Sequence, residues 1–230
     1  MRNRYNYNCC WTEVVVCIFS ILFSLKANAN VTRVPENFAT IQDALNSIAG
    51  GDTIVISASN YRERVQVSCN VTIASNYIFT GDSNQILNTI WISDSAGNLI
   101  NPQSYGISLI GIKFVAISVS REIRMVLSGV LSHFELSNCR FEGVFDSASS
   151  TSRRILFIDG SPDIIINNCL FSADSNAKIT WIRIQNANNV KVFNTTVLGR
   201  NRNSNYIFSV NCDSIDINQC NFLSVGKGLF

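Results

Sequence analysis

The stretch "IIINNCLF" (164–171) reads as a strand whose alternation is broken in the middle. Ile164 and Ile166 lie two residues apart, as the inward residues of a strand do, but the next apolar pair, Cys169 and Phe171, begins after a step of three. This change of step predicts a bend at Asn168, where the chain leaves one sheet and enters another.

Four other stretches follow the same template, with apolar residues at the first, third and eighth places and an amide or glycine at the fifth. They are "ISLIGIKF" (107–114), "FELSNCRF" (134–141), "VKVFNTTV" (190–197) and "IDINQCNF" (215–222). The fifth place is held by Gly111, Asn138, Asn168, Asn194 and Gln219, at intervals of 27, 30, 26 and 25 residues. Such a repeat predicts a solenoid of stacked parallel strands, with the amides in a ladder at one corner. In the alternative, each asparagine is only a turn former.

Residues 1–29 have the features of a secretory signal sequence. Arg2 and Arg4 precede an apolar run, and the "ANA" that ends at Ala29 is a small-x-small cleavage site. The run of 12 residues (14–25) is too short to span a bilayer, so we expect no membrane span in the mature chain. The predicted organisation is a signal peptide at 1–29 and one parallel β-helix domain at 30–230. The protein is expected to be secreted, either extracellular or periplasmic.

The charge of the chain bears on its partners. The sequence holds 18 basic and 16 acidic residues, and cleavage after Ala29 would leave 15 of each. A near-neutral chain without a basic stripe does not favour a nucleic-acid partner. With 47% hydrophobic and 15% charged residues, a single domain with one core is expected.

Three of the five cysteines beyond the predicted cleavage site share the sixth place of the repeat. The five are Cys69, Cys139, Cys169, Cys212 and Cys220. The three repeat cysteines lie a whole repeat or more apart, unlike the closely spaced ligands of a zinc site, so we expect neither a metal nor another cofactor. Stacking would place Cys169 and Cys220 too far apart for a disulfide, and would strain one between Cys139 and Cys169.

The segment "TIQDALNSIAGG" (40–51) predicts a short amphipathic helix. Its apolar face consists of Ile41, Ala44, Leu45 and Ile48. Thr40 and Asp43 form a capping-box arrangement, and the two glycines mark the stop. The first coil of a solenoid would otherwise expose core and strand edges, so the helix is expected to cap the N-terminal end.

The segment "VPENFATIQDALNSIAGGDTIVISASNYRERVQVSCNVTIAS" (34–75) resembles the opening of pectin-lyase-like right-handed parallel β-helix proteins, among them the pectin methylesterases. In these proteins a Thr-Ile-Gln helix is followed by Gly-Asp-Thr, a strand and a Gly-x-Tyr-x-Glu turn, in which this chain has Ser59 for the glycine. The resemblance implies an all-β fold, a right-handed parallel β-helix with a short N-terminal capping α-helix. It implies no activity, because lyases, esterases, hydrolases, adhesins and binding proteins share this opening.

The catalytic motifs of enzymes with this fold are missing from the sequence. The Gln-Asp-Thr, Asp-Phe-x-Phe-Gly and Arg-Pro-Trp segments of pectin methylesterases do not occur, and Asp146 is interpreted as a loop acid. The Asp-Asp and Gly-His-Gly segments of polygalacturonases are also absent, and the single histidine, His133, is expected at the surface. Asp159, Asp163 and Asp174 show no convergent spacing that would suit a Ca²⁺-dependent lyase. The catalytic residues therefore remain unassigned.

One outward feature, in "KITWIRIQN" (178–186), suits a saccharide. Alternation directs Trp181 and Arg183 outward and aligns Phe157 with them one coil earlier. Aromatic faces beside an arginine suit sugar rings and uronate carboxylates, so Phe157, Trp181 and Arg183 are candidate polysaccharide-binding residues. In the alternative, a loop such as 144–153 covers this stripe and buries it.

These observations favour a secreted β-helix protein that binds polysaccharide or a surface partner without a catalytic set. The alternative is a carbohydrate-active enzyme of the pectinesterase or polysaccharide lyase type, cut short before its site is complete. Few residues follow "IDINQCNFLS" (215–224), so no C-terminal cap is expected and the last coil should expose Ile217 and Phe222. Either the natural polypeptide continues, or the protein self-associates end to end through this coil.

Overall fold

The computed structural model describes residues 29–93, 98–102, 106–117, 133–144, 153–173, 179–199 and 205–224. The predicted signal sequence at 1–29 lies outside the described residues, apart from Ala29. None of the helices in the described part of the chain is long and apolar enough to cross a membrane.

All strand pairings in the described residues are parallel, and the strands form three sheets. The nine-stranded sheet contains β1 (Val31–Val34), β2 (Asp52–Ile56), β5 (Val71–Ser75), β8 (Ile107–Ile110), β10 (Phe134–Ser137), β13 (Asp163–Asn167), β15 (Ile179–Phe193), β12 (Arg153–Asp159) and β17 (Asn205–Asn218). The seven-stranded sheet contains β3 (Ser59–Tyr61), β6 (Thr89–Ser93), β9 (Lys113–Ile117), β11 (Arg140–Val144), β14 (Leu170–Ala173), β16 (Thr196–Gly199) and β18 (Asn221–Ser224). β4 (Val65–Val67) pairs with β7 (Ile100–Pro102).

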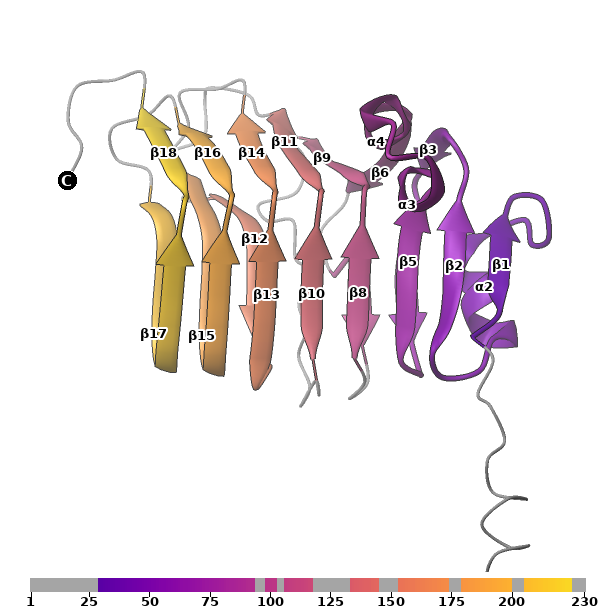
Figure 1. Cartoon of the computed structure of the whole chain (residues 1–230), viewed down its shortest axis with the longest axis horizontal. Helices are drawn as coiled ribbons and strands as arrows, with labels where there is room; N and C mark the ends of the chain where they lie inside the picture. The colour runs from indigo at the N-terminus through magenta and orange to yellow at the C-terminus, as the bar shows by residue number, and fades with distance from the viewer. Residues whose placement is uncertain are drawn as a thin grey trace, which may run out of the picture.

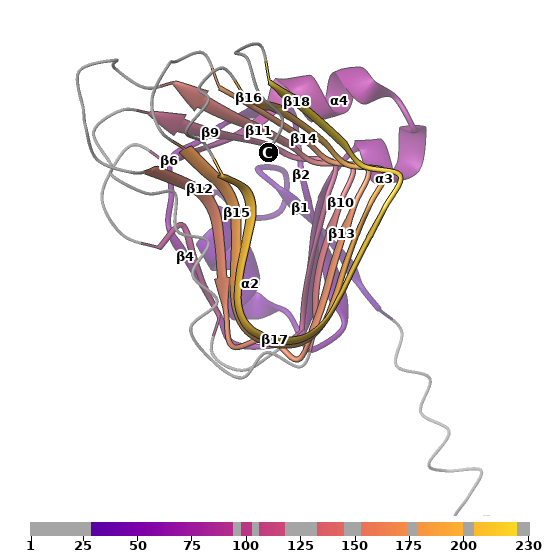
Figure 2. The ribbon, with the colours of Figure 1, turned by 90° about the vertical axis from the view of Figure 1, so that its left-hand side faces the viewer.

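The strands stack coil on coil along the long axis of the molecule, from β1 at one end to β17 and β18 at the other (Figure 1). Viewed with the C-terminal end in front, the chain advances anticlockwise toward the viewer, which makes the solenoid right-handed (Figure 2). The long strands β15 and β17 curve around a corner, so that β15 pairs with β12 along its first half and with β13 along its second. The predicted right-handed parallel β-helix is confirmed.

The first corner joins the nine-stranded sheet to the seven-stranded sheet at the fifth place of the repeat. Its residues all have positive φ angles: Gly111 (67°), Asn138 (56°), Asn168 (50°), Asn194 (51°) and Gln219 (54°). Asparagine and glycine tolerate this left-handed conformation better than other residues do. The backbone N–H of each corner asparagine donates to a carbonyl of the next coil, as from Asn168 to Phe193 at 3.1 Å. The predicted bend is confirmed, and the parallel ladder continues through it.

A second corner of the same design lies between β12 and β13 and within β15 and β17, and the repeat template did not predict it. Gly160, Asn186 and Asn211 occupy it with φ angles of 78°, 54° and 53°. Asn211 Nδ2 donates to Asn186 Oδ1 at 3.1 Å, and Asn186 Nδ2 donates to Asp159 Oδ1 at 2.7 Å. Two of its three copies, Asn186 and Asn211, lie inside the continuous strands β15 and β17.

Like residues stack on like inside the solenoid. The eighth place forms an aromatic column in which Trp91, Phe114, Phe141 and Phe171 lie 5.9, 4.9 and 4.5 Å apart by ring centroids. Beside it, the sixth-place side chains donate to the carbonyl two residues earlier in the chain: Cys139 to Ser137, Cys169 to Asn167, Thr195 to Phe193 and Cys220 to Asn218. Cys139 and Cys169 are free thiols, so the column is held by packing and hydrogen bonds without a disulfide.

Helix α2 (Ile41–Ser47) covers the first coil, as predicted. Polar residues of the opening segment (34–75) hold it there. Thr40 Oγ1 accepts from Asp43 N at 3.0 Å, while the carboxylate of Glu63 accepts from Ile41 N and Gln42 N at 3.0 and 3.1 Å. The side chain of Gln42 pairs with both backbone groups of Gln66. Each of these polar residues therefore has a structural task in the cap.

The last described coil exposes apolar side chains. Ile215, Ile217 and Leu223 are 38%, 43% and 55% exposed. Within the described residues, β17 pairs only with β15 and β18 only with β16. Ile217 is exposed as predicted, whereas Phe222 is partly buried and packs against the core. The missing C-terminal cap and self-association through the last coil stay predictions.

The left-handed corner predicts that Asn168→Leu destabilises the fold by about 1 to 2 kcal/mol, since a branched side chain is strained at positive φ. Asn168→Gly should lose less, because glycine adopts this conformation without strain. Urea unfolding monitored by circular dichroism measures both variants. Equal losses in the two variants would show that the corner conformation does not limit stability.

If the last coil mediates association, light scattering at micromolar concentration should give the mass of a dimer for purified protein that consists of residues 30–230. Ile217→Lys should then give the mass of a monomer, since a charge in a buried apolar contact is costly. Ser214→Lys is the matched control, because it adds the same charge to the same strand at an outward place. A wild-type monomer would contradict end-to-end association.

Candidate functional site

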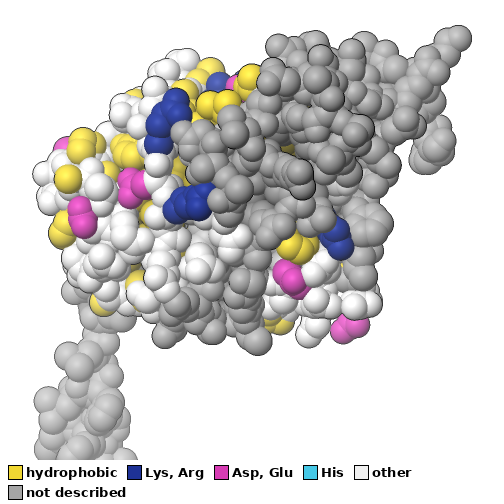
Figure 3. Space-filling model, turned by 180° about the vertical axis from the view of Figure 1, so that it is seen from behind, with side chains coloured by type: hydrophobic (Ala, Val, Ile, Leu, Met, Phe, Trp, Pro, Cys, Tyr) yellow, Lys and Arg dark blue, Asp and Glu magenta, His cyan; other side chains and the backbone are white. Residues whose placement is uncertain are grey.

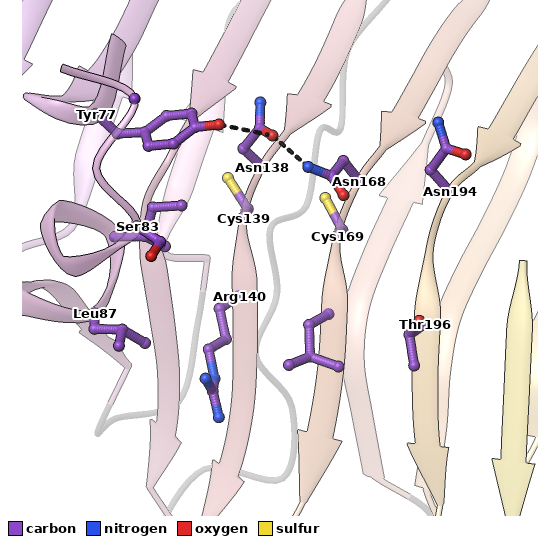
Figure 4. Close-up of a pocket in the computed structure, with 13 residues that line it drawn as sticks. Tyr77, Ser83, Leu87, Asn138, Cys139, Arg140, Asn168, Cys169, Asn194 and Thr196 are labelled. Carbon is purple, nitrogen blue, oxygen red and sulfur yellow. Dashed lines mark hydrogen bonds between the residues drawn. The ribbon is translucent and has the colours of Figure 1, made fainter. Parts of the chain in front are cut away.

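An open groove of about 540 Å³ lies on the outer side of the first corner. One wall comes from helices α3 (Tyr77–Thr80) and α4 (Ser83–Asn88), which interrupt the repeat after β5. The remaining lining comes from successive coils at the first corner, including Asn138, Asn168 and Asn194 (Figure 4). The groove thus arises where an inserted helical hairpin stands beside a regular row of corner residues.

The corner asparagines point their amides outward. At positive φ the asparagine faces the surface and the small residue after it faces the core, so Asn168 and Asn194 are exposed while Cys169 is buried. Asn168 Nδ2 donates to Asn138 Oδ1 at 2.6 Å, which is the predicted ladder contact. Asn194 departs from the prediction, because its Nδ2 donates to Asn167 Oδ1 at 3.4 Å. The ladder therefore lies on the surface, and its amides keep hydrogen-bonding capacity for another molecule.

Tyr77 takes the place of an amide in the coil of Gly111. Its hydroxyl donates to Asn138 Oδ1 at 3.3 Å and so continues the row. A Cβ atom at Gly111 would lie 2.9 Å from the Cβ and Cδ1 atoms of Tyr77, so only glycine leaves room for the ring. This contact explains why the fifth place of the repeat carries glycine in this one coil.

The helical hairpin that forms the wall is anchored at its start and at its turn. Arg33 donates to Asn76 Oδ1 at 2.9 Å, and its guanidinium lies 5.4 Å from the centroid of the Phe79 ring. Gly81, at φ 66°, ends α3, and Asp82 Oδ1 caps α4 by accepting from Asn84 N at 2.9 Å. The hairpin is thereby held against the first coils of the solenoid.

The charges near the groove are largely paired. Arg140 Nε lies 2.9 Å from Glu142 Oε1, and Lys113 Nζ lies 2.8 Å from Glu142 Oε2. Burial raises the pKa of the Cys169 thiol well above its usual range, and the neighbouring Cys139 adds to this effect. The thiol of Cys169 is therefore protonated at neutral pH and does not serve as a nucleophile.

The three candidate residues of the outward stripe lie together on β12 and β15. Phe157 pairs in register with Arg183, whose guanidinium lies 5.4 Å from the ring centroid. Trp181 is 0% exposed and Phe157 is 8% exposed, so both rings are buried, as in the alternative of a covered stripe. Residues 145–152 of the loop suggested as the cover lie outside the described residues. A role of Phe157, Trp181 and Arg183 in binding stays a prediction.

Next to the stripe lie polar residues, Gln185 and Asp159, that the alternation of the sequence did not predict as part of a site. Arg183 donates to Gln185 Oε1 at 3.1 Å, and Gln185 Nε2 donates to Asp159 Oδ2 at 2.6 Å. Both oxygens of Asp159 are engaged, because Asn186 donates to the other one. Asp159 therefore orders the second corner.

The histidine lies at the surface, as predicted, but it has a carboxylate partner. His133 Nδ1 lies 2.7 Å from Asp163 Oδ2, and Asn189 Nδ2 donates to Asp163 Oδ1 at 2.8 Å. Glu135 lies next to this pair and accepts from Ser137 Oγ at 2.7 Å. Asp146 and Asp174 lie outside the described residues. In the described part of the chain, no three His, Cys, Asp or Glu residues are placed to hold a metal ion.

No protein-family model and no curated protein sequence matches the chain. Among solved structures, the pectin methylesterase from Aspergillus niger is similar, with 16% sequence identity over 87% of each chain and a TM-score of 0.41. At this sequence identity and TM-score, the similarity carries no conclusion about function. The parallel β-helix itself is seen directly in the strand pairing, and it agrees in architecture with the pectin-lyase-like proteins that the opening motif resembles.

The repeat pattern identified the asparagines of the groove but not its wall. Tyr77 and Leu87 lie in a segment without strand alternation, and no spacing in the sequence relates them to the coil of Asn138. The glycine at position 111, in a place otherwise held by amides, was the available signal. It marks the coil against which another side chain packs.

Gly111→Ala should displace Tyr77 and destabilise the fold by about 1 to 3 kcal/mol, because the new methyl group overlaps the ring and is strained at positive φ. Urea unfolding measures the loss, and near-ultraviolet circular dichroism reports the movement of aromatic side chains. Gly50→Ala is the control, since a Cβ atom there meets nothing within 4 Å. An unchanged near-ultraviolet spectrum in Gly111→Ala would contradict the packing of Tyr77 on this glycine.

Proposed function

We propose that the protein is secreted and binds a polysaccharide in the groove at the first corner, without catalysing a reaction on it. The observation that carries this proposal is the row of outward amides, Asn138, Asn168 and Asn194, along the floor of an open groove. The row repeats once per coil, at the roughly 4.8 Å spacing of parallel strands. A regular row of this kind favours an extended ligand that is itself a repeat.

The chemistry of the lining favours a hydroxyl-rich ligand. A carboxamide offers two N–H donors and an acceptor oxygen, so it can bond a sugar hydroxyl in either role. The hydroxyl groups of Ser83 and Thr196 add further sites of the same kind. Leu87 and Leu170 supply apolar surface for the carbon-bound face of a sugar ring.

The described residues of the groove favour binding over catalysis. None of those that line it is an aspartate, a glutamate or a histidine, which are the usual acid and base groups of glycoside cleavage. The thiol of Cys169 is buried and protonated. Arg140, the one charged side chain of the lining, is engaged by Glu142.

Two other surfaces remain in the proposal. The stripe of Phe157, Trp181 and Arg183 is a second candidate contact for polysaccharide, through the partly exposed Arg183. The alternative function, a carbohydrate-active enzyme on a pectin-like polysaccharide, is favoured by the contact of His133 with Asp163 beside Glu135. That cluster places a base and carboxylates on the outer face of β10 and β13.

Affinity electrophoresis in gels that contain polygalacturonic acid, xylan, glucomannan or β-glucan tests binding. Wild-type protein should be retarded by at least one polymer, and Asn168→Gly and Asn194→Gly should each weaken the interaction about tenfold, since each removes an amide yet suits positive φ. Asn211→Gly is the matched control, because it makes the same change at the second corner, outside the groove. Arg183→Ala tests the stripe separately.

Equal weakening in Asn168→Gly and Asn211→Gly would contradict binding in the groove, and so would the absence of retardation by all four polymers. Assays of depolymerisation and methanol release on pectin address the enzymatic alternative. Turnover that His133→Ala abolishes would replace the binding proposal with an enzyme.

A further inference from the structure

The groove is closed at one end and open at the other. Toward the N-terminal coils, the row of amides stops at Asn138, and the ring of Tyr77 fills the next place over Gly111. Ser83 and Leu87, both on α4 of the helical hairpin, line the groove on the same side (Figure 4). Toward the C-terminal coils, Gln219 continues the corner beyond Asn194 with the same backbone conformation and is exposed.

Contacts hold the wall in place at Tyr77 and at the start of each helix. Tyr77 is held by its contact with Gly111 and by the bond from its hydroxyl to Asn138. The hairpin behind it is fixed by the Arg33 bond to Asn76 and by the capped start of α4. A chain that lies along the amides therefore meets a fixed obstacle at Tyr77 and cannot continue past it in the same direction.

We infer that the groove recognises the end of a polysaccharide chain and not its interior; this inference rests on the proposed binding of polysaccharide in the groove. An internal segment must leave the groove at both ends, whereas a terminal segment needs only the open end beside Gln219. The terminal sugar meets the Tyr77 oxygen, which can still accept a hydrogen bond, together with the Ser83 hydroxyl and the apolar side chain of Leu87. These groups suit a ring that carries free hydroxyl groups on one edge and a carbon-bound face.

Binding of chain ends differs measurably from binding of internal segments, because only the first depends on the number of chain ends in the sample. Polygalacturonic acid, xylan, glucomannan and β-glucan serve as probes, each intact and cleaved into oligosaccharides of defined length. Intact polymer or its oligosaccharides, added at equal mass, then compete for the protein with the polymer in the gel. Recognition of ends predicts that tenfold shorter chains compete about tenfold better by mass, because they carry tenfold more ends. Recognition of the interior predicts equal competition by mass.

Lowering the wall provides a second test. Leu87→Ala removes an exposed side chain of the wall, so the fold should be retained, and the preference for cleaved over intact polymer should fall by severalfold. Ile78→Ala is the matched control, because it truncates an exposed apolar residue of the same hairpin that does not line the groove. The control should keep the wild-type preference.

The outcomes separate this inference from the proposed function. Binding that Asn168→Gly weakens, with equal competition by intact and cleaved polymer at equal mass, overturns the recognition of ends and keeps the groove as a binding site. The same holds if Leu87→Ala and Ile78→Ala behave alike. No binding to any of the four polymers overturns both. A preference for cleaved polymer that only Leu87→Ala reduces supports the inference.

Discussion

The structure depends on one constraint, the parallel pairing of each coil with the next across the bends of the chain. Backbone N–H and C=O groups that are buried without partners are costly, so the hydrogen-bond ladder has to continue through the corners. A residue at positive φ achieves this, because it turns the chain while its N–H still donates to a carbonyl of the next coil. The identity of the corner residue follows from this geometry, and asparagine and glycine dominate for that reason.

The same corner geometry sorts side chains between core and surface. The corner residue faces outward and the residue after it faces inward, where only a small side chain fits beside the aromatic column. Cys139, Cys169 and Thr195 fill this inner place and bond the carbonyl two residues earlier. Stability and surface chemistry are thus coupled, because the stacking that builds the core also builds the outward row of amides.

The candidate site appears where the chain departs from its own repeat. The helices α3 and α4 add a wall beside an otherwise uniform corner, and Tyr77 joins the wall to the ladder through Asn138.

On the face opposite to that of Figure 1, basic and acidic side chains are scattered among apolar ones over the described residues (Figure 3). The opening motif adds nothing to the chemistry, since Gln42 and Glu63 are both used to fasten the capping helix.

The sequence by itself determined the solenoid, its capping helix and the corner at the fifth place of the repeat, because these depend on short-range alternation and on stacking of like residues. It did not determine the second corner, because the same change of inward step, from Ile184 to Ala187, is followed by Asn188 and Asn189 and so does not stand out as the start of a new strand. Alternation also placed Trp181 on the outer side of its strand but could not show that the ring is buried, because burial depends on what else packs there. The wall of the groove was decided by the tertiary structure: Tyr77 meets Asn138 across 61 residues, and no local pattern says which side chain contacts the coil of Gly111.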